Sequence, residues 1–199
     1  MKKLLLLAAV ALLTLGCNQT NNTMDKQQAA LDNIYTRVSV RHFTGEPVAE
    51  EQIDALLRAG MAAPTAVNKQ PWAFLVIDRP DQLAAIGEAF PNSRVANGAS
   101  LAIVACGDLD KALEGEAQDY WIQDVSAATE NILLAAHAMG LGAVWSGVYP
   151  ISERVQQART FFALPDHIVP LCIITVGHPA EQPAVKDKYK PENIHRNRW

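Results

Sequence analysis

The 199-residue chain is poor in cysteine and has no strong excess of charge of either sign. Its three cysteines, Cys17, Cys106 and Cys172, lack the paired spacing of a zinc site. A formal net charge of −4 gives no support to a nucleic-acid-binding protein. The sequence contains no internal repeat, no P-loop and no G-x-G-x-x-G motif. These absences leave one ordinary domain with a sizeable apolar core, because nearly half of the residues are hydrophobic.

The chain also lacks the side-chain sets that carry out chemistry without a cofactor. No nucleophile is matched with a base, and no pair of carboxylates has an evident acid/base task. A protein of this kind is typical of reactions in which a bound cofactor supplies the chemistry and the protein supplies orientation.

The N-terminus has the layout of a secretory signal peptide. Met1–Lys3 is basic, Leu4–Leu15 is almost entirely apolar, and Gly16 and Cys17 follow. The apolar run is shorter than the ~20 residues that span a membrane. The sequence resembles a bacterial lipoprotein processing site, although Thr14 replaces the usual leucine. We therefore expect a signal peptide at residues 1–16, a lipidated Cys17 and tether at 17–23, and an exported protein anchored in the bacterial cell envelope. An uncleaved anchor and a soluble secreted form are the alternatives.

A polar alternation follows at Arg37–Arg41. In a strand, alternate side chains point to opposite faces, so Arg37, Ser39 and Arg41 would share one face. Two guanidinium groups beside a hydroxyl group suit an anion or the polar edge of a heteroaromatic ring. A solvated edge strand is the alternative.

Helical and extended patterns alternate along the rest of the chain. Ser152 is expected to cap the last helix. Helices are predicted at 24–36, from Pro47 to just before Pro64, and at 81–90, 119–139 and 152–161; strands are predicted at 73–77, 100–107, 143–147 and 169–176. Cys106 and Cys172 fall in two of the strands, where they are either buried thiols or, if the strands are neighbours, a disulfide.

Ala63–Phe74 reads A-P-T-A-V-N-K-Q-P-W-A-F and runs into a strand. Together with R-V-S-V-R at 37–41, it resembles the FMN-dependent nitroreductase family, and the similarity extends from Tyr35 to Trp199. The resemblance implies an α+β fold for residues 24–199, a three-layer α/β/α sandwich with a mixed, mainly antiparallel sheet. It also implies an intertwined homodimer, with the helix at 119–139 in the interface.

The resemblance further implies an FMN site built from both subunits. Many relatives carry glutamate where Ser146 stands, so substrate preference is expected to differ. The implied FMN ligands are Arg37, Ser39 and Arg41 for the phosphate, ribityl chain and pyrimidine edge; Pro64, Thr65, Ala66 and Asn68 from the partner subunit, joined by Gln123; Trp145, Ser146 and Gly147 along the ring; and Lys186 and Lys188 for the phosphate.

The activity implied is that of an FMN-dependent NAD(P)H oxidoreductase. Hydride would pass in a ping-pong cycle through flavin N5 to nitroaromatic or quinone-type acceptors, with no catalytic side chain. Altered flavin chemistry, such as dehalogenation, and a non-catalytic flavin-binding lipoprotein are the alternatives. Because cytosolic NAD(P)H does not reach an exported enzyme freely, a membrane quinol or reduced partner is a further candidate for the electron donor.

Overall fold

The computed structural model describes residues 25–199, so the expected signal peptide, tether and lipidated Cys17 lie outside the described residues. Residues 25–36 form a helix, as predicted. Residues 37–199 form a separate compact unit. Among the described residues, no helix is both long enough and apolar enough to cross a membrane.

The compact unit is built on a four-stranded sheet with the order β1-β2-β4-β3. All pairings between these strands are antiparallel, and a bulge interrupts the register between Ala105 and Cys106. The strands are β1 (Trp72–Ile77), β2 (Leu101–Asp108), β3 (Gly142–Gly147) and β4 (Ile168–Gly177). The four predicted strands are therefore confirmed to within a few residues.

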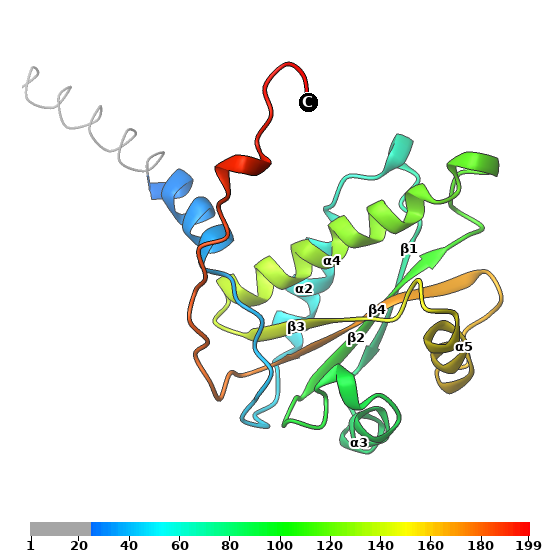
Figure 1. Cartoon of the computed structure of the whole chain (residues 1–199). Helices are drawn as coiled ribbons and strands as arrows, with labels where there is room; N and C mark the ends of the chain where they lie inside the picture. Colours follow the sequence, from blue (N-terminus) through cyan, green and yellow to red (C-terminus); the bar gives the residue numbers. More distant parts are fainter. Residues whose placement is uncertain (1–24) are drawn as a thin grey trace, which may run out of the picture. The chain divides into compact units, whose positions relative to one another are not determined.

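Helices cover both faces of the sheet (Figure 1). On one face, α2 (Glu50–Met61) and α4 (Tyr120–Ala138) pack against a core that includes Leu101 and Ile103. On the other face, α3 (Pro80–Ala89) and α5 (Ser152–Phe161) pack against a core that includes Ala102 and Val104. Because β2 is buried along its whole length, its alternate side chains fill both cores. The predicted three-layer α+β fold is confirmed.

Helix α4 is the central helix, as its apolar spacing predicted. Trp121, Val125, Ala128 and Ile132 are all buried in its seam. Gly107 is required beneath it, since a Cβ there would lie 2.3 Å from Cε3 of Trp121. Tight packing of this helix on β2 fixes the position of the residues on its other faces.

Two predicted helix starts are wrong. Helix α2 begins at Glu50 rather than at Pro47, because the backbone N–H of Ala49 donates to Oε1 of Gln52 at 3.1 Å and closes the N-terminus there. Helix α5 begins at Ser152, but Ile151 is its N-cap and no side chain caps it. Ser152 therefore lies inside the first turn and does not act as a cap.

Cys106 and Cys172 are free thiols. They lie on paired strands, yet Cys106 belongs to the α3/α5 core and Cys172 to the α2/α4 core. Side chains on opposite faces of a sheet do not meet, so these two cysteines form no disulfide. Burial raises the pKa of each thiol to about 12.

Candidate functional site

The segment Arg37–Arg41 is not a strand of the sheet, so that prediction is wrong. It runs beside the start of β3, where the N–H of Val40 donates to the carbonyl of Ala143 at 3.1 Å. Val40 is buried, and a Cβ at Gly142 would lie 2.7 Å from its Cγ1. A single close contact with β3 replaces the continuous ladder that a strand would need.

The polar groups of this segment have partners that the sequence pattern did not reveal. Nε of Arg37 lies 3.2 Å from Oε1 of Glu130 on α4. The backbone N–H of Arg41 donates to Oε1 of Glu181 at 2.7 Å, and its carbonyl accepts from Nδ2 of Asn97 at 2.8 Å. Arg37 is therefore ion-paired, and the backbone around Arg41 is held on both sides.

The start of the C-terminal tail lies beside this segment (Figure 1). The N–H of Thr44 donates to the carbonyl of His178, and the N–H of Ala180 donates to the carbonyl of His42, both at 3.0 Å. Farther along the tail, Lys186 and Lys188 are exposed. Neither lysine forms an ion pair with a carboxylate in residues 25–199. The fold thus brings the base of the tail next to the segment after Arg41 and leaves both lysines open to an anion.

The loop between α2 and β1 is conformationally strained. It contains the short helix η1 (Ala66–Asn68), and three of its residues have positive φ: Val67 (42°), Asn68 (59°) and Gln70 (52°). Positive φ is uncommon outside glycine and is a genuine outlier for β-branched valine. Such strain clusters at ligand clamps and active sites. The strain makes this loop, which contains the implied FMN contacts Pro64, Thr65, Ala66 and Asn68, a candidate functional element.

Asp124 anchors this loop, a role that the sequence pattern did not predict. It lies on α4, is 6% exposed, and accepts the N–H of Ala66 on its Oδ1 at 2.9 Å. The N–H of Gln70 donates to Oγ1 of Thr65 at 3.1 Å and closes the loop from within. Gln123, the neighbour of Asp124, is exposed. The one available signal was a carboxylate within the apolar seam of 119–139.

The end of β3 presents backbone groups at the free edge of the sheet. The carbonyl of Ala143 points away from β4, toward Val40. In an antiparallel strand the N–H and C=O of one residue point to the same side, and successive residues point to opposite sides. The N–H groups of Trp145 and Gly147 therefore point outward, like the carbonyl of Ala143, whereas the N–H of Ser146 points toward β4. The outward donors are therefore those of Trp145 and Gly147.

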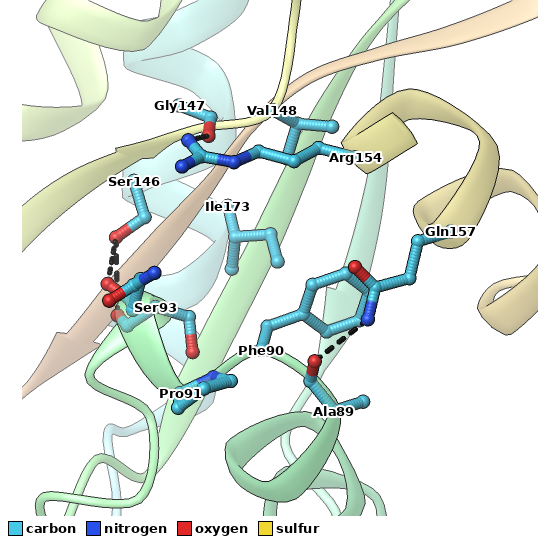
Figure 2. Close-up of a pocket in the computed structure, with 11 residues that line it drawn as sticks. Ala89, Phe90, Pro91, Ser93, Ser146, Gly147, Val148, Arg154, Gln157 and Ile173 are labelled. Carbon is cyan, nitrogen blue, oxygen red and sulfur yellow. Dashed lines mark hydrogen bonds between the residues drawn. The ribbon is translucent and has the colours of Figure 1, made fainter. Parts of the chain in front are cut away.

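The side chain of Ser146 is already occupied (Figure 2). Its Oγ donates to the carbonyls of Asn92 and Ser93, at 3.2 and 3.3 Å, in the short helix η2 (Pro91–Ser93). Gly147 is exposed, and a Cβ built on it would meet no atom within 4 Å. The structure is thus open where a Cβ on Gly147 would lie, while Ser146 holds η2 in place.

One cluster of metal-ligating groups lies elsewhere among the described residues. Asp108, Asp110 and His167 offer ligand atoms within 4.8 Å of one another. However, Nζ of Lys111 already lies 2.7 Å from Oδ2 of the buried Asp108. We interpret Asp108 as part of an ion pair between the end of β2 and the loop that follows it, because the ammonium group of Lys111 already supplies the countercharge.

Apart from Lys186 and Lys188, the predicted site residues form three groups within one chain. The first is Arg37–Arg41 with the base of the tail, and the second is the end of β3. The third is the strained loop with Gln123, which lies at the other end of α4 from Arg37–Arg41 (Figure 1).

Comparison with known proteins identifies the family of this chain. A family model described as the nitroreductase family matches residues 34–178. The chain belongs to the nitroreductase family. The match covers all four strands and α2–α5, so the family framework includes the strained loop and the open edge of β3.

Individual family members are similar over most of the chain. A Methanothermobacter thermautotrophicus protein, provisionally named NADH dehydrogenase/NAD(P)H nitroreductase, is 43% identical over 85% of this chain and 87% of its own length. A crystal structure with the same provisional name from Parabacteroides distasonis is 43% identical, has a TM-score of 0.79, and covers 85% of this chain and 98% of its own. A provisionally named nitroreductase from Desulfovibrio desulfuricans, crystallised in complex with FMN, is 35% identical, has a TM-score of 0.68, and covers 85% of this chain and 97% of its own.

Proposed function

We propose that this protein is an FMN-dependent oxidoreductase of the nitroreductase type that reduces nitroaromatic or quinone-type acceptors. The observation that carries the proposal is the free edge of β3, where the N–H of Gly147 points away from β4 and a Cβ built on Gly147 would meet no atom within 4 Å. Membership of the nitroreductase family supports a flavin site in this chain, since one relative of the same fold is crystallised in complex with FMN.

The residues present fit FMN. A phosphate dianion needs cations and strong donors, and Lys186 and Lys188 are exposed and unpaired with carboxylates in the described chain. Arg37 retains part of its guanidinium fork beyond the contact with Glu130. A planar ring system needs a flat wall with donors, which the backbone at Trp145 and Gly147 supplies.

When bound, FMN supplies the redox chemistry by taking a hydride at N5 from one substrate and passing it to the next in a ping-pong cycle. The chain's own contribution is binding and orientation. The N–H of Gly147, which points away from β4, would donate to the ring, and Ser39 and Arg41 belong to the segment beside β3. No side chain is assigned to proton transfer.

The functional unit is proposed to be a homodimer in which the strained loop reaches the flavin of the partner subunit. Several large apolar side chains are exposed in regions that the chain itself does not cover. They include Met61, Val67, Val185, Tyr189, Ile194 and Trp199. Sedimentation equilibrium of the purified protein tests this proposal, and a monomer that retains flavin would contradict it.

The protein is also proposed to be an exported lipoprotein attached through Cys17. Cytosolic NAD(P)H is not freely available in that compartment, so a membrane quinol or a reduced partner is proposed as an alternative electron donor. Mass spectrometry of the N-terminal peptide, with Cys17→Ser as the control, tests the anchor. An unmodified N-terminus in the native host would contradict it.

An absorbance spectrum of the purified protein tests the central proposal, followed by anaerobic reduction with NADH, NADPH and a quinol analogue. We expect a flavin spectrum that one of these donors bleaches and that a nitroaromatic or quinone acceptor restores. A colourless protein that takes up no added FMN would overturn the proposal and support a non-catalytic role.

A further inference from the structure

A pocket lies immediately beside Gly147, on the side of the sheet that faces η2 and α5 (Figure 2). It contains about 90 Å³ of space that water can enter. Its walls are mainly apolar, and the side chains that matter below are Phe90, Val148, Arg154 and Ile173. The pocket also includes Ser146 and Gly147, so it adjoins the edge at which we place the flavin ring.

Arg154 is the only charged residue that lines this pocket. Its Nη1 donates to the carbonyl of Gly147 at 3.2 Å, which holds the guanidinium group at the pocket (Figure 2). A guanidinium group has five N–H donors in a planar fork, so this bond leaves most of them available. Among residues 25–199, no carboxylate forms an ion pair with Arg154.

Arg154 lies at the end of its helix where a positive charge is electrostatically unfavourable. It lies in the first turn of α5, which begins at Ser152. A cation near a helix N-terminus is opposed by the macrodipole, whereas an anion is favoured there. Glu153 already places one carboxylate in this turn, and an anion bound to Arg154 would add a second negative charge there.

Three other polar side chains of the pocket already have partners, and the exposed Asn92 is neutral. Nε2 of Gln157 donates to the carbonyl of Ala89 at 2.9 Å, and Oγ of Ser93 accepts the N–H of Val95 at 3.3 Å. Oγ of Ser146 donates to η2. Arg154 therefore supplies the strongest free donors that a ligand would meet.

The apolar wall is rigid. The ring of Phe90 stacks on Phe162, with centroids 5.7 Å apart and planes inclined by 5°. Phe161 packs edge-on against Phe90 at 5.2 Å. With Val148 and Ile173 buried behind it, the wall offers a fixed apolar surface, which suits a planar ring better than a flexible chain.

We propose that this pocket binds the carboxylate of a small aromatic acid through Arg154, and that the enzyme therefore prefers acceptors that combine an aromatic ring with an anionic group. The proposal rests on the proposed function for the position of the reducible group, but not for binding itself. Arg154 acts as a specificity residue, because it contacts the substrate carboxylate and takes no part in electron transfer.

The test compares two nitroaromatic probes that differ by one carboxylate, 4-nitrobenzoate and nitrobenzene, with the flavin-loaded protein. Arg154→Ala is expected to raise KM for 4-nitrobenzoate by about tenfold to a hundredfold, the range for loss of a charged hydrogen bond. KM for nitrobenzene should stay unchanged. Arg154→Lys should recover only part of the loss, because an ammonium group lacks the planar fork.

Arg79→Ala is the matched control, since it removes one exposed arginine that pairs with Asp81 on α3. It should change neither KM. Two results for Arg154→Ala would overturn the proposal. A rise in KM for both probes would mean that the substitution disturbs the flavin site. No rise in KM for either probe would mean that the pocket does not bind the substrate.

Calorimetric titration with benzoate separates this proposal from the proposed function. Wild-type protein should bind benzoate, and Arg154→Ala should lose at least about tenfold in affinity. If the protein proves inactive with every donor but binds benzoate through Arg154, the proposed function fails and the pocket stands. If flavin turnover is present but benzoate binding is absent or unaffected by the substitution, the pocket proposal fails alone.

Discussion

The carboxylate of Asp124 accepts a 2.9 Å hydrogen bond from the backbone N–H of Ala66 and so ties the N-terminal part of α4 to the strained loop. Asp124 is buried, whereas most of the loop that follows Ala66 is exposed. A rigid helix therefore holds the first residue of a loop in which Val67, Asn68 and Gln70 all have positive φ. Strain of this kind persists only where surrounding structure fixes it.

Replacing Asp124 should weaken both flavin binding and the fold. Asp124→Ala removes the acceptor for the N–H of Ala66, at a cost of about 1–3 kcal/mol in unfolding free energy. The freed loop should raise the Kd for FMN by about tenfold. Asp124→Asn keeps an oxygen acceptor and should restore most of the affinity. Urea unfolding and flavin fluorescence measure the two effects, and equal Kd values for the Ala and Asn variants would refute the anchoring role.

The phosphate site is tested by comparing FMN with riboflavin, which lacks the phosphate. The double variant Arg37→Ala/Lys186→Ala should lose FMN affinity by about tenfold to a hundredfold, because charged hydrogen bonds to the phosphate are removed. Riboflavin affinity should stay the same. Arg79→Ala/Lys111→Ala removes the same charge at exposed positions elsewhere and serves as the control. Equal losses for both ligands would mean that these residues do not bind the phosphate.

Two glycines of β3 should respond in opposite ways to alanine. At Gly147 a Cβ meets open space, so Gly147→Ala should change stability by less than about 1 kcal/mol while it obstructs the proposed ring site and lowers FMN occupancy. At Gly142 a Cβ would lie 2.7 Å from Cγ1 of Val40, and Gly142→Ala should destabilise the fold by about 1–3 kcal/mol. Thermal unfolding and flavin content distinguish the two. Full flavin occupancy in Gly147→Ala would place the ring elsewhere.

The buried thiols predict a loss of stability in alkali. Burial raises the pKa of Cys106 and Cys172 from 9.0 to about 12, so the unfolded chain releases their protons at lower pH than the native chain. Stability from this source is complete below pH 9 and is lost as the pH rises toward 12. Urea unfolding at several pH values should show this slope. The variant Cys106→Ala/Cys172→Ala should show a shallower one, and an unchanged slope would assign the effect to other groups.

The same burial should protect both thiols from modification. At pH 8 the native protein should not react at Cys106 or Cys172 with a thiol reagent, since the thiolate is the reactive form. Both should react after unfolding in guanidinium chloride. Cys17→Ser removes the remaining cysteine and gives a clean background. Rapid labelling of the native variant would show that the β2/β4 core opens easily.

Several features were predictable because they depend on local pattern. The apolar seam from Trp121 to Ile132 identified α4, and the burial of β2 on both faces followed from its continuous apolar run. The alternation at Arg37–Arg41 failed as a prediction of a strand, because that assignment needs a partner along the whole segment, and only Val40 finds one on β3.

Within the candidate site, the sequence by itself determined which residue types are present: cations at both ends of the domain, the amide-rich loop after Pro64, and the glycine at the end of β3. Only the tertiary structure decided how they act. Strand register selected Gly147 rather than Ser146 as the outward donor, and helix packing placed Asp124 under the loop and Glu130 beside Arg37. Contacts between distant residues depend on how whole elements pack, and no local pattern encodes that arrangement.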